Sequence, residues 1–277
     1  MTAERRRPDY YLLNVFLVVL GLAIVTPFFW FFINSLASSD QTFTTPPTWW
    51  PDDMSITNYR EVFDALPFGT QILNSVKITG IAVVGSLVVS CLAAYAFARI
   101  EFRGRNALFL VLLTAMMIPA PVMTVPVFVV MRELGLLNTH ASLWLPALIQ
   151  VFSIFLLRQH FMAIPKELEE AAIMDGAGRL RILVTMFIPM SGSVISALAI
   201  LIATTYWNDF MSPSVFLVSP DKMTIPVGLV QLQNAFGSAP TLNVFAGITL
   251  VVAPLFVLFL IVQPYLTKGV AMQGISR

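Results

Sequence analysis

The stretch Tyr11–Leu36, which reads YLLNVFLVVLGLAIVTPFFWFFINSL, decides the fold class of this chain. A helix that crosses a bilayer needs roughly 20 mostly apolar residues, and this stretch supplies them. Its segment Asn14–Val25 does not alternate between apolar and polar residues, as a strand of a membrane barrel would. Arg5, Arg6 and Arg7 precede it, but the apolar part exceeds the roughly 7–15 residues of a signal peptide. We therefore predict a retained membrane helix.

Five further stretches of this kind follow, separated by polar or proline-rich segments. The composition agrees with them, because 57% of the residues are apolar and 11% are charged, against about 25% charged in soluble domains. The predicted fold is an all-α membrane protein with six transmembrane helices, in which residues 1–10 and 267–277 are cytoplasmic tails and residues 11–266 form the transmembrane domain. The expected spans are Tyr11–Leu36, Ile72–Ala98, Ala107–Met131, Ala141–Phe161, Ser191–Met211 and Val244–Leu266.

The distribution of Lys and Arg predicts the orientation of these spans, since cytoplasmic loops carry the excess. One side of the predicted topology holds only Arg60, Arg132 and Lys222, and Lys77 lies within the second span. All other basic residues fall on the opposite side, together with both chain ends. We therefore expect both termini in the cytoplasm and the protein in the cell membrane as a multi-pass component.

Several classes of function are disfavoured by what the chain lacks. The net charge of +1 offers no field that would hold nucleic acid, and one cysteine with two histidines cannot form a zinc cluster. An intramembrane enzyme would need a nucleophile with a base, or a metal set, within the spans, and the sequence contains neither. A carrier that works alone, the alternative kept open, is disfavoured because acids and histidines deep in the spans are nearly absent. No G-x-x-x-x-G-K-[ST] phosphate loop is present, so any ATP hydrolysis falls to a partner.

Two spans carry features that packing or transport would explain. Small residues at every fourth position of the second span predict close helix packing, with a substrate path as the less favoured interpretation; they are Ala82, Ser86, Ser90, Ala94 and Ala98. The third span contains Pro119, Pro121 and Pro126, which predict a broken or bent helix. Such a helix either forms a wall of a translocation pathway or is a packed helix with a static kink.

The inner loop 164–189 is the most informative segment, and it begins IPKELEEAAIMDGAG. Pro165 and the following acids favour a helix start, and Gly176 and Gly178 favour its end. A second short helix is expected from Leu180, Leu183, Val184 and Phe187, before Pro189 opens the next span. Two short helices joined by a glycine turn suit docking into a groove of a partner.

Glu170-Ala171-Ala172, Gly176 and Pro189 together resemble the EAA signature of permease subunits in bacterial ABC importers. The resemblance covers most of the chain and points to the carbohydrate branch, similar to the smaller permease of maltose-type importers. Segments Ala94–Arg99, Leu134–Thr139, Phe155–Gln159 and Trp207–Phe210 carry it as well.

This resemblance implies a subunit without catalysis of its own that imports a sugar, with a di- or oligosaccharide expected and glycerophosphodiesters as an alternative. It implies a homologous permease, a cytoplasmic ABC ATPase dimer that uses ATP and Mg, and an extracytoplasmic solute-binding protein as partners, all at a lipid bilayer and without nucleic acid. No cofactor or metal is expected on this chain itself. The residues assigned to coupling with the ATPase by the resemblance are Glu170, Ala171, Ala172, Asp175 and Gly176.

The residues of the substrate pathway are less well defined by the sequence. Trp207, Asn208 and Asp209 combine an aromatic ring with amide and carboxylate groups, which suits hydroxyl-rich sugars. The same residues suit a helix end at the membrane interface. With Pro119 and Pro126 they are the candidate pathway residues.

Overall fold

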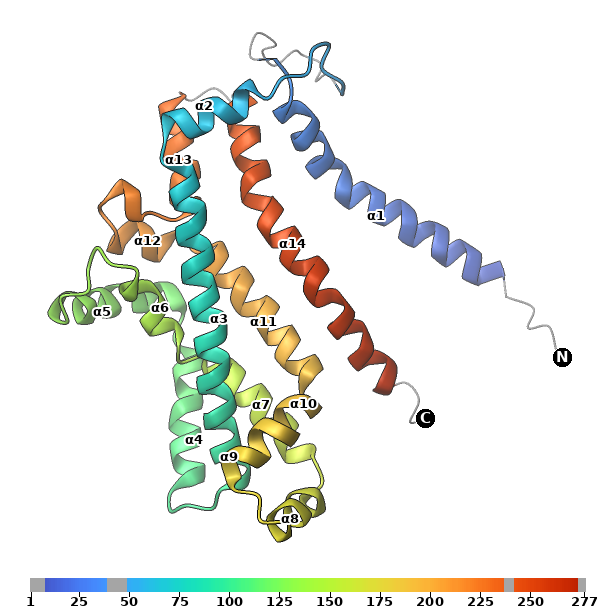
Figure 1. Ribbon diagram of the computed structural model, residues 1–277, viewed down its shortest axis with the longest axis vertical. Coiled ribbons are helices and arrows are strands. Elements are labelled where there is room, and N and C mark those ends of the chain that lie inside the picture. Colours follow the sequence, from blue (N-terminus) through green and yellow to red (C-terminus); the bar gives the residue numbers. More distant parts are fainter. Residues whose placement is uncertain (1–7, 39–48, 237–241, 274–277) are drawn as a thin grey trace. The chain divides into compact units, whose positions relative to one another are not determined.

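The computed structural model describes residues 8–38, 49–236 and 242–273, and over these ranges its regular structure is helical (Figure 1). One antiparallel bridge, between Ala37 and Met54, is the exception within them. The chain divides into two compact units, one of Met1–Phe68 with Leu229–Ala253 and the other of Gly69–Gly228 with Pro254–Arg277. The expected N-terminal tail lies largely outside the described residues, as do residues 274–277.

The first unit is organised around the C-terminal end of α1 (Pro8–Ser35). It also contains α2 (Thr57–Ala65), most of α13 (Ile225–Ala235) and the first part of α14 (Leu242–Gln273). Phe245 packs against Trp30 and Phe31, with ring centroids 5.3 Å and 5.1 Å apart. The buried Asn58 amide donates to the carbonyls of Ser35 and Ala37, at 3.0 Å and 2.7 Å. These bonds satisfy carbonyls that the end of α1 leaves without helical partners.

The second unit contains the helices that build the candidate site. Within it, α7 packs against both α4 and α11, and α12 packs against α5 and α6. Figure 1 shows α8 at the end of the unit where α3 finishes and α4 begins. Its elements are α3 (Phe68–Arg99), α4 (Arg105–Thr114), η1 (Ala115–Met117), α5 (Ala120–Glu133), α6 (Ala141–Ala147), α7 (Val151–Ala163), α8 (Lys166–Met174), α9 (Arg179–Ile182), η2 (Leu183–Phe187), α10 (Ile188–Met190), α11 (Gly192–Trp207), α12 (Met211–Phe216) and η3 (Pro220–Lys222), with the start of α13 and the part of α14 from Pro254 on.

The described helices contain four that are long and apolar enough to cross a membrane, and six spans if each of two bent helix pairs is one span. These four match the first, second, fourth and sixth expected spans, and the fourth is formed by α6 and α7 in succession. The last helix, α14, continues to Gln273, past the expected end at Leu266. The all-α membrane fold is confirmed, and two of its spans are not straight.

The third span is broken at Pro119, between η1 and α5, and is bent there by 107°. A proline disfavours the helical conformation of the residue before it, and Ile118 accordingly has an extended backbone, with φ −89° and ψ 120°. Pro121 and Pro126 do not interrupt the helix α5. Pro121 lies in the first turn of α5, where its missing N–H has no helical acceptor, and Pro126 is accommodated inside the helix.

The fifth span also bends, by 82°, between α10 and α11. The expectation that Pro189 opens this span is wrong by a few residues, because Pro189 lies inside α10 and the break falls at Ser191. Buried Ser191 donates from Oγ to the Phe187 carbonyl at 2.7 Å, which satisfies that carbonyl next to the break. The short helical segment before the break therefore continues past Pro189 and ends at Met190.

The stripe of small residues on α3 serves packing, as predicted. Ala82, Ser86, Ser90 and Ala94 are all fully buried, and Ala98, the fifth member, is partly buried and packs against the core. Small side chains at this spacing let neighbouring helices approach closely in lipid.

Candidate functional site

A helix and a glycine turn form the first candidate site, at the cytoplasmic end expected for loop 164–189. Helix α8 follows Pro165 and ends at Met174, with Asp175 as its C-cap. The chain then turns through Gly176, whose φ is +79°, and the N–H groups of Gly176 and Ala177 donate to the carbonyls of Ile173 and Ala172, at 2.9 Å and 3.0 Å. A Cβ at Gly176 would meet open space, so the positive φ alone favours glycine here.

Helix α8 presents two different faces. Glu170 and Ala171 are exposed, whereas Ala172 packs against the buried core of its own unit and Glu169 is mostly buried. Asp175 and Gly176 are exposed at the turn. Five residues were expected to contact a partner. Ala172 instead packs against the core of this chain, whereas Glu170, Ala171, Asp175 and Gly176 are accessible to a partner.

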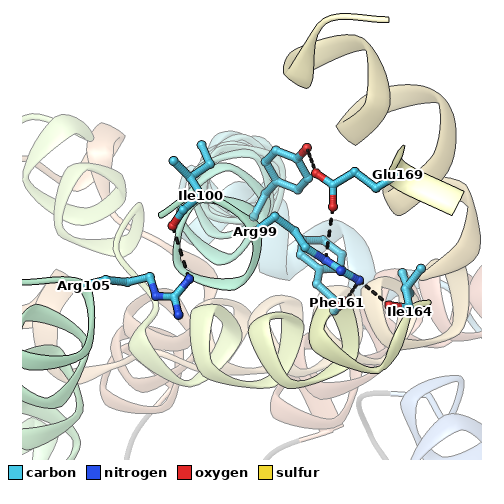
Figure 2. Close-up of polar contacts among 7 residues, drawn as sticks. Arg99, Ile100, Arg105, Phe161, Ile164 and Glu169 are labelled. Carbon is cyan, nitrogen blue, oxygen red and sulfur yellow. Dashed lines mark hydrogen bonds and ion pairs between the residues drawn. The ribbon is translucent and has the colours of Figure 1, made fainter. Parts of the chain in front are cut away.

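A buried arginine ties α8 to two long helices, as Figure 2 shows. Arg99, the last residue of α3, has a side chain that is 4% exposed, and its Nε lies 3.6 Å from Oε2 of Glu169. Its Nη2 donates to the carbonyl of Phe161, at 2.6 Å, and to that of Ile164, at the end of α7 (Figure 2). A guanidinium group suits this position because its fork reaches a carboxylate and carbonyls together.

Aromatic side chains complete the surroundings of Arg99. Tyr95, one turn earlier on α3, donates its hydroxyl to Oε1 of Glu169 at 2.7 Å. The Phe187 ring lies under the guanidinium, 5.0 Å from its central carbon, and packs edge-on against Tyr95 and Phe161. We call Tyr95, Arg99, Glu169 and Phe187 the Arg99 cluster.

Reasoning from the sequence did not find the Arg99 cluster. Tyr95 and Arg99 belong to a segment that carries the family resemblance, and in the sequence Glu169 is one of the acids that favour the start of a helix. The sequence does contain one indication of the cluster: Arg99 directly follows a long apolar span, and a cation that is buried at such a position requires a partner. The sequence contains several acids on the cytoplasmic side, however, and does not say which of them is that partner.

The second short helix of the loop differs from its predicted face. Leu183 and Phe187 are buried as expected, but Leu180 and Val184 are 65% and 54% exposed, and the buried Ile182 takes part in the core instead. The buried face of this short helix is therefore formed by Ile182, Leu183 and Phe187, and the last two begin and end the π-helical turn η2 (Leu183–Phe187). Leu180 therefore adds an apolar side chain to the accessible surface of the loop.

The five candidate pathway residues do not converge on one place. Trp207 is buried and lines an apolar cavity of about 260 Å³ with residues of α3 and α14. Asp209 lines a different cavity, of about 420 Å³, between α5, α6, α11 and α12. Asn208 is exposed and donates to the Thr204 carbonyl at 2.8 Å, which is typical of a helix end.

Pro119 and Pro126 are exposed, and their neighbours Ala120 and Val127 line the cavity that contains Asp209. Pro119 therefore affects this cavity indirectly, because the break at Pro119 sets the direction of α5, and α5 forms one wall of the cavity. In the part of the chain that the structure describes, no group of His, Cys, Asp and Glu side chains is arranged to hold a metal ion.

A second feature that the sequence did not reveal is a set of hydrogen bonds around Asn138, in a loop that the sequence places on the outer side. Asn138 adopts a positive φ of 56°, and its Oδ1 accepts from the N–H groups of Val218 and Ser219, both at 3.1 Å. Its Nδ2 donates to Ser219 Oγ at 2.8 Å, and Lys222 Nζ donates to its carbonyl at 3.0 Å. Asn138 thereby holds the segment that follows α12 against the segment that follows α5.

Comparison with known proteins gives a consistent result over nearly the whole chain. The family model described as "Binding-protein-dependent transport system inner membrane component" matches residues 86–272. The arabinooligosaccharides transport system permease protein AraQ of Halalkalibacterium halodurans is 34% identical over 82% of this chain and 81% of its own. The trehalose/maltose transport system permease protein MalG of Thermococcus litoralis is 30% identical over 93% of this chain and 94% of its own.

A solved structure shares this fold. It belongs to a bacterial ABC transporter involved in the import of the acidic polysaccharide alginate. The similarity has a TM-score of 0.79 at 26% identity, and it covers 96% of this chain and 99% of the other.

Proposed function

Because the chain belongs to the family of binding-protein-dependent transport system inner membrane components, we propose that it is the permease through which an ATP-driven importer moves a di- or oligosaccharide into the cell. As a member of this family it is a multi-pass inner-membrane subunit of an ABC transporter and is not an enzyme. The finer statements below, on substrate, partners and coupling residues, are our proposal.

The observation that carries the proposal is the accessible surface of α8 and the turn after it. Ile173, Met174 and Leu180 are 51%, 86% and 65% exposed, and Glu170 and Asp175 lie among them. Large exposed apolar side chains with a charged rim are typical of a protein interface. We assign this coupling surface, defined by these five residues, to contact with the cytoplasmic ATPase dimer, which binds and hydrolyses ATP with Mg.

The Arg99 cluster supports transmission of movement from that surface. When the ATPase subunits close, a force on α8 reaches α3 through Glu169 and Arg99, and it reaches α7 through the carbonyls that Arg99 binds. Because both helices belong to expected spans, a displacement of α8 shifts them together. In this mechanism the chain alternates between inward- and outward-facing states beside a homologous permease, and a solute-binding protein delivers the sugar from outside.

The experiment that tests this proposal is purification of the tagged chain from native membranes in mild detergent. We expect an ABC ATPase, a second permease and a solute-binding protein to co-purify, and ATP hydrolysis to rise when the binding protein carries its sugar. The variant Glu170→Lys should lose the ATPase from the complex. Glu133→Lys is the matched control, because Glu133 is an equally accessible glutamate at the end of α5.

Recovery of the chain without any ATPase, in several detergents, would contradict the proposal and would favour the carrier that works alone. Equal loss of the ATPase from Glu170→Lys and Glu133→Lys would remove the coupling surface from the argument. A permease for glycerophosphodiesters is the remaining alternative, and it predicts the same partners with an anionic solute.

A further inference from the structure

The cavity that contains Asp209, which we call the polar cavity, lies among helices of one unit. Its volume of about 420 Å³ falls within the range of about 300–1,000 Å³ that is common for small-molecule sites. Its apolar lining includes Leu143 and Phe216. Its polar lining consists of Thr124, Ser142, Gln150, Tyr206, Asp209 and Ser212.

Two of the polar groups are oriented by partners within the protein. Gln150 donates from Nε2 to the Tyr206 hydroxyl at 2.7 Å, so the oxygen of Tyr206 accepts and its proton remains to be donated. Asp209 accepts the Ser212 N–H on Oδ1 at 3.2 Å. In the part of the chain that the structure describes, neither the Tyr206 proton nor Oδ2 of Asp209 has a partner.

The charge of the lining restricts the class of ligand. Among the described residues that line the polar cavity, Asp209 carries the only formal charge, and no Lys, Arg or His is present. A carboxylate without a nearby cation repels phosphate esters and uronates. Acceptors, donors and apolar side chains in alternation suit a neutral molecule with many hydroxyls and C–H faces.

We propose that the polar cavity binds an uncharged polyhydroxylated solute on its way through the membrane, and that Asp209 excludes anionic solutes. This inference rests on the proposed function and names the chemical class of its substrate. It also separates the roles of the candidate pathway residues: Asp209 contacts the solute together with Gln150 and Tyr206. Trp207 does not contact it, because its cavity is lined almost wholly by apolar groups.

The first test measures transport by the full complex in proteoliposomes, with maltose, trehalose, diacetylchitobiose and arabinotriose as neutral probes and sn-glycerol 3-phosphate and a triuronate as anionic probes. We expect uptake of at least one neutral probe and of neither anion. For the transported sugar, Tyr206→Phe and Asp209→Asn should each lower uptake about tenfold. ATP hydrolysis stimulated by the binding protein should stay within about twofold of wild type, because the coupling surface is intact. Thr205→Val is the control, since Thr205 is the neighbour of Tyr206 on α11 but does not line the cavity.

Import of an anionic probe by the wild type would overturn the inference and leave the importer proposal standing. Unchanged uptake in both variants would also overturn it. A parallel loss of uptake and of ATP hydrolysis would indicate a purely structural role for the two residues and would equally overturn it.

A second test reads the cavity directly and does not need the natural solute or the partners. Cys91, the only cysteine, is buried and can be replaced by alanine, after which Ser212→Cys places a single thiol at the polar cavity. We measure its reaction with methanethiosulfonate reagents of opposite charge. Relative to Ser214→Cys, an exposed position on α12 outside the cavity, the cationic reagent should be favoured about tenfold over the anionic one.

Asp209→Asn should abolish that preference. Equal rates for the two reagents at Ser212→Cys, or a preference that persists in Asp209→Asn, would overturn the role of Asp209 in excluding anions.

Discussion

At the scale of single residues, Arg99 does the most to connect the coupling surface to the spans. Its guanidinium is nearly inaccessible, and it contacts the Glu169 carboxylate of α8 and two carbonyls at the end of α7. Burial of a charge is costly unless hydrogen bonds and an opposite charge compensate for it. The contacts of Arg99 provide both, which explains how a cation can end an apolar helix inside the protein.

We expect Arg99→Ala to destabilise the protein by about 3–5 kcal/mol, because it leaves Glu169 as a buried charge without its cation. Thermal unfolding of the purified protein in detergent measures this loss. The matched control is Arg132→Ala, which breaks an ion pair whose side chains are 59% and 69% exposed and should change stability by less than about 0.5 kcal/mol. Similar melting temperatures for the two variants would show that the Arg99 cluster contributes little.

Gly176 is the residue whose backbone conformation matters most to the coupling surface. We predict that Gly176→Val uncouples transport from ATP hydrolysis, since a side chain at φ +79° costs about 1–2 kcal/mol and a β-branched one costs more. Sugar uptake and ATP hydrolysis, measured on the same membranes at equal expression, test this. Gly178→Ala is the control, because Gly178 has an ordinary φ of −72° and open space at its Cβ. Wild-type uptake by Gly176→Val would refute the prediction.

At the scale of elements, the two bent spans show how breaks in a helix are accommodated. The break in the third span follows from the proline that restricts Ile118, and the break in the fifth span is accompanied by the Ser191 hydroxyl, which bonds the Phe187 carbonyl. Broken helices at membrane depth are tolerated where protein or a water-filled cavity satisfies the freed backbone groups. The polar cavity lies beside the first of these breaks, with Ala115 and Ala120 from either side of it in its lining.

We predict that replacing both Pro119 and Pro121 by alanine opens the bend of the third span, because α4 and α5 can then continue as one helix. Spin labels on Val111 and Val130, both exposed, report the bend in a background without Cys91. A straight helix would separate these backbone positions by about 29 Å, and the double variant should gain a population near that distance.

Pro126→Ala is the control for this prediction. Pro126 lies inside α5 and causes no break, so its removal should leave the distance unchanged. If the double variant also keeps the wild-type distance, packing of α5 against α12 sets the bend instead of proline.

At the scale of the whole molecule, the chain forms two compact units, and each has its own packing and its own polar contacts. Asn58 and the aromatic contacts of Phe245 stabilise the first, and the Arg99 cluster and Asn138 stabilise the second. The orientation of the chain in the membrane is a property of the whole molecule, and the distribution of Lys and Arg among its loops predicts it.

We therefore expect both termini in the cytoplasm. A green fluorescent protein fused after Arg277 should fluoresce, and alkaline phosphatase fused after Asp53 should be active, because the first requires the cytoplasm and the second an oxidising exterior. Phosphatase fused after Arg103 serves as the control and should be inactive. The opposite pattern of activities would reverse the predicted orientation.

The sequence by itself determined the class of the protein, the number of its expected spans, its family and the glycine turn of the coupling loop. These properties depend on composition and on residues close in sequence: an apolar stretch such as Tyr11–Leu36 has to be helical in a bilayer, and Gly176 stands where a short helix must end. The short-range pattern was wrong for the second short helix of the loop, where Leu180 and Val184 are exposed and Ile182 is buried instead.

Only the tertiary structure decided which distant side chains act together. It joined Arg99 to Glu169, attached Asn138 to Ser219, and separated Trp207 from Asp209 into an apolar and a polar cavity. The physical reason is that a buried charge or amide is stable only where hydrogen-bond partners or an opposite charge surround it. Those partners come from other helices, whose packing cannot be derived from residues near the group in sequence.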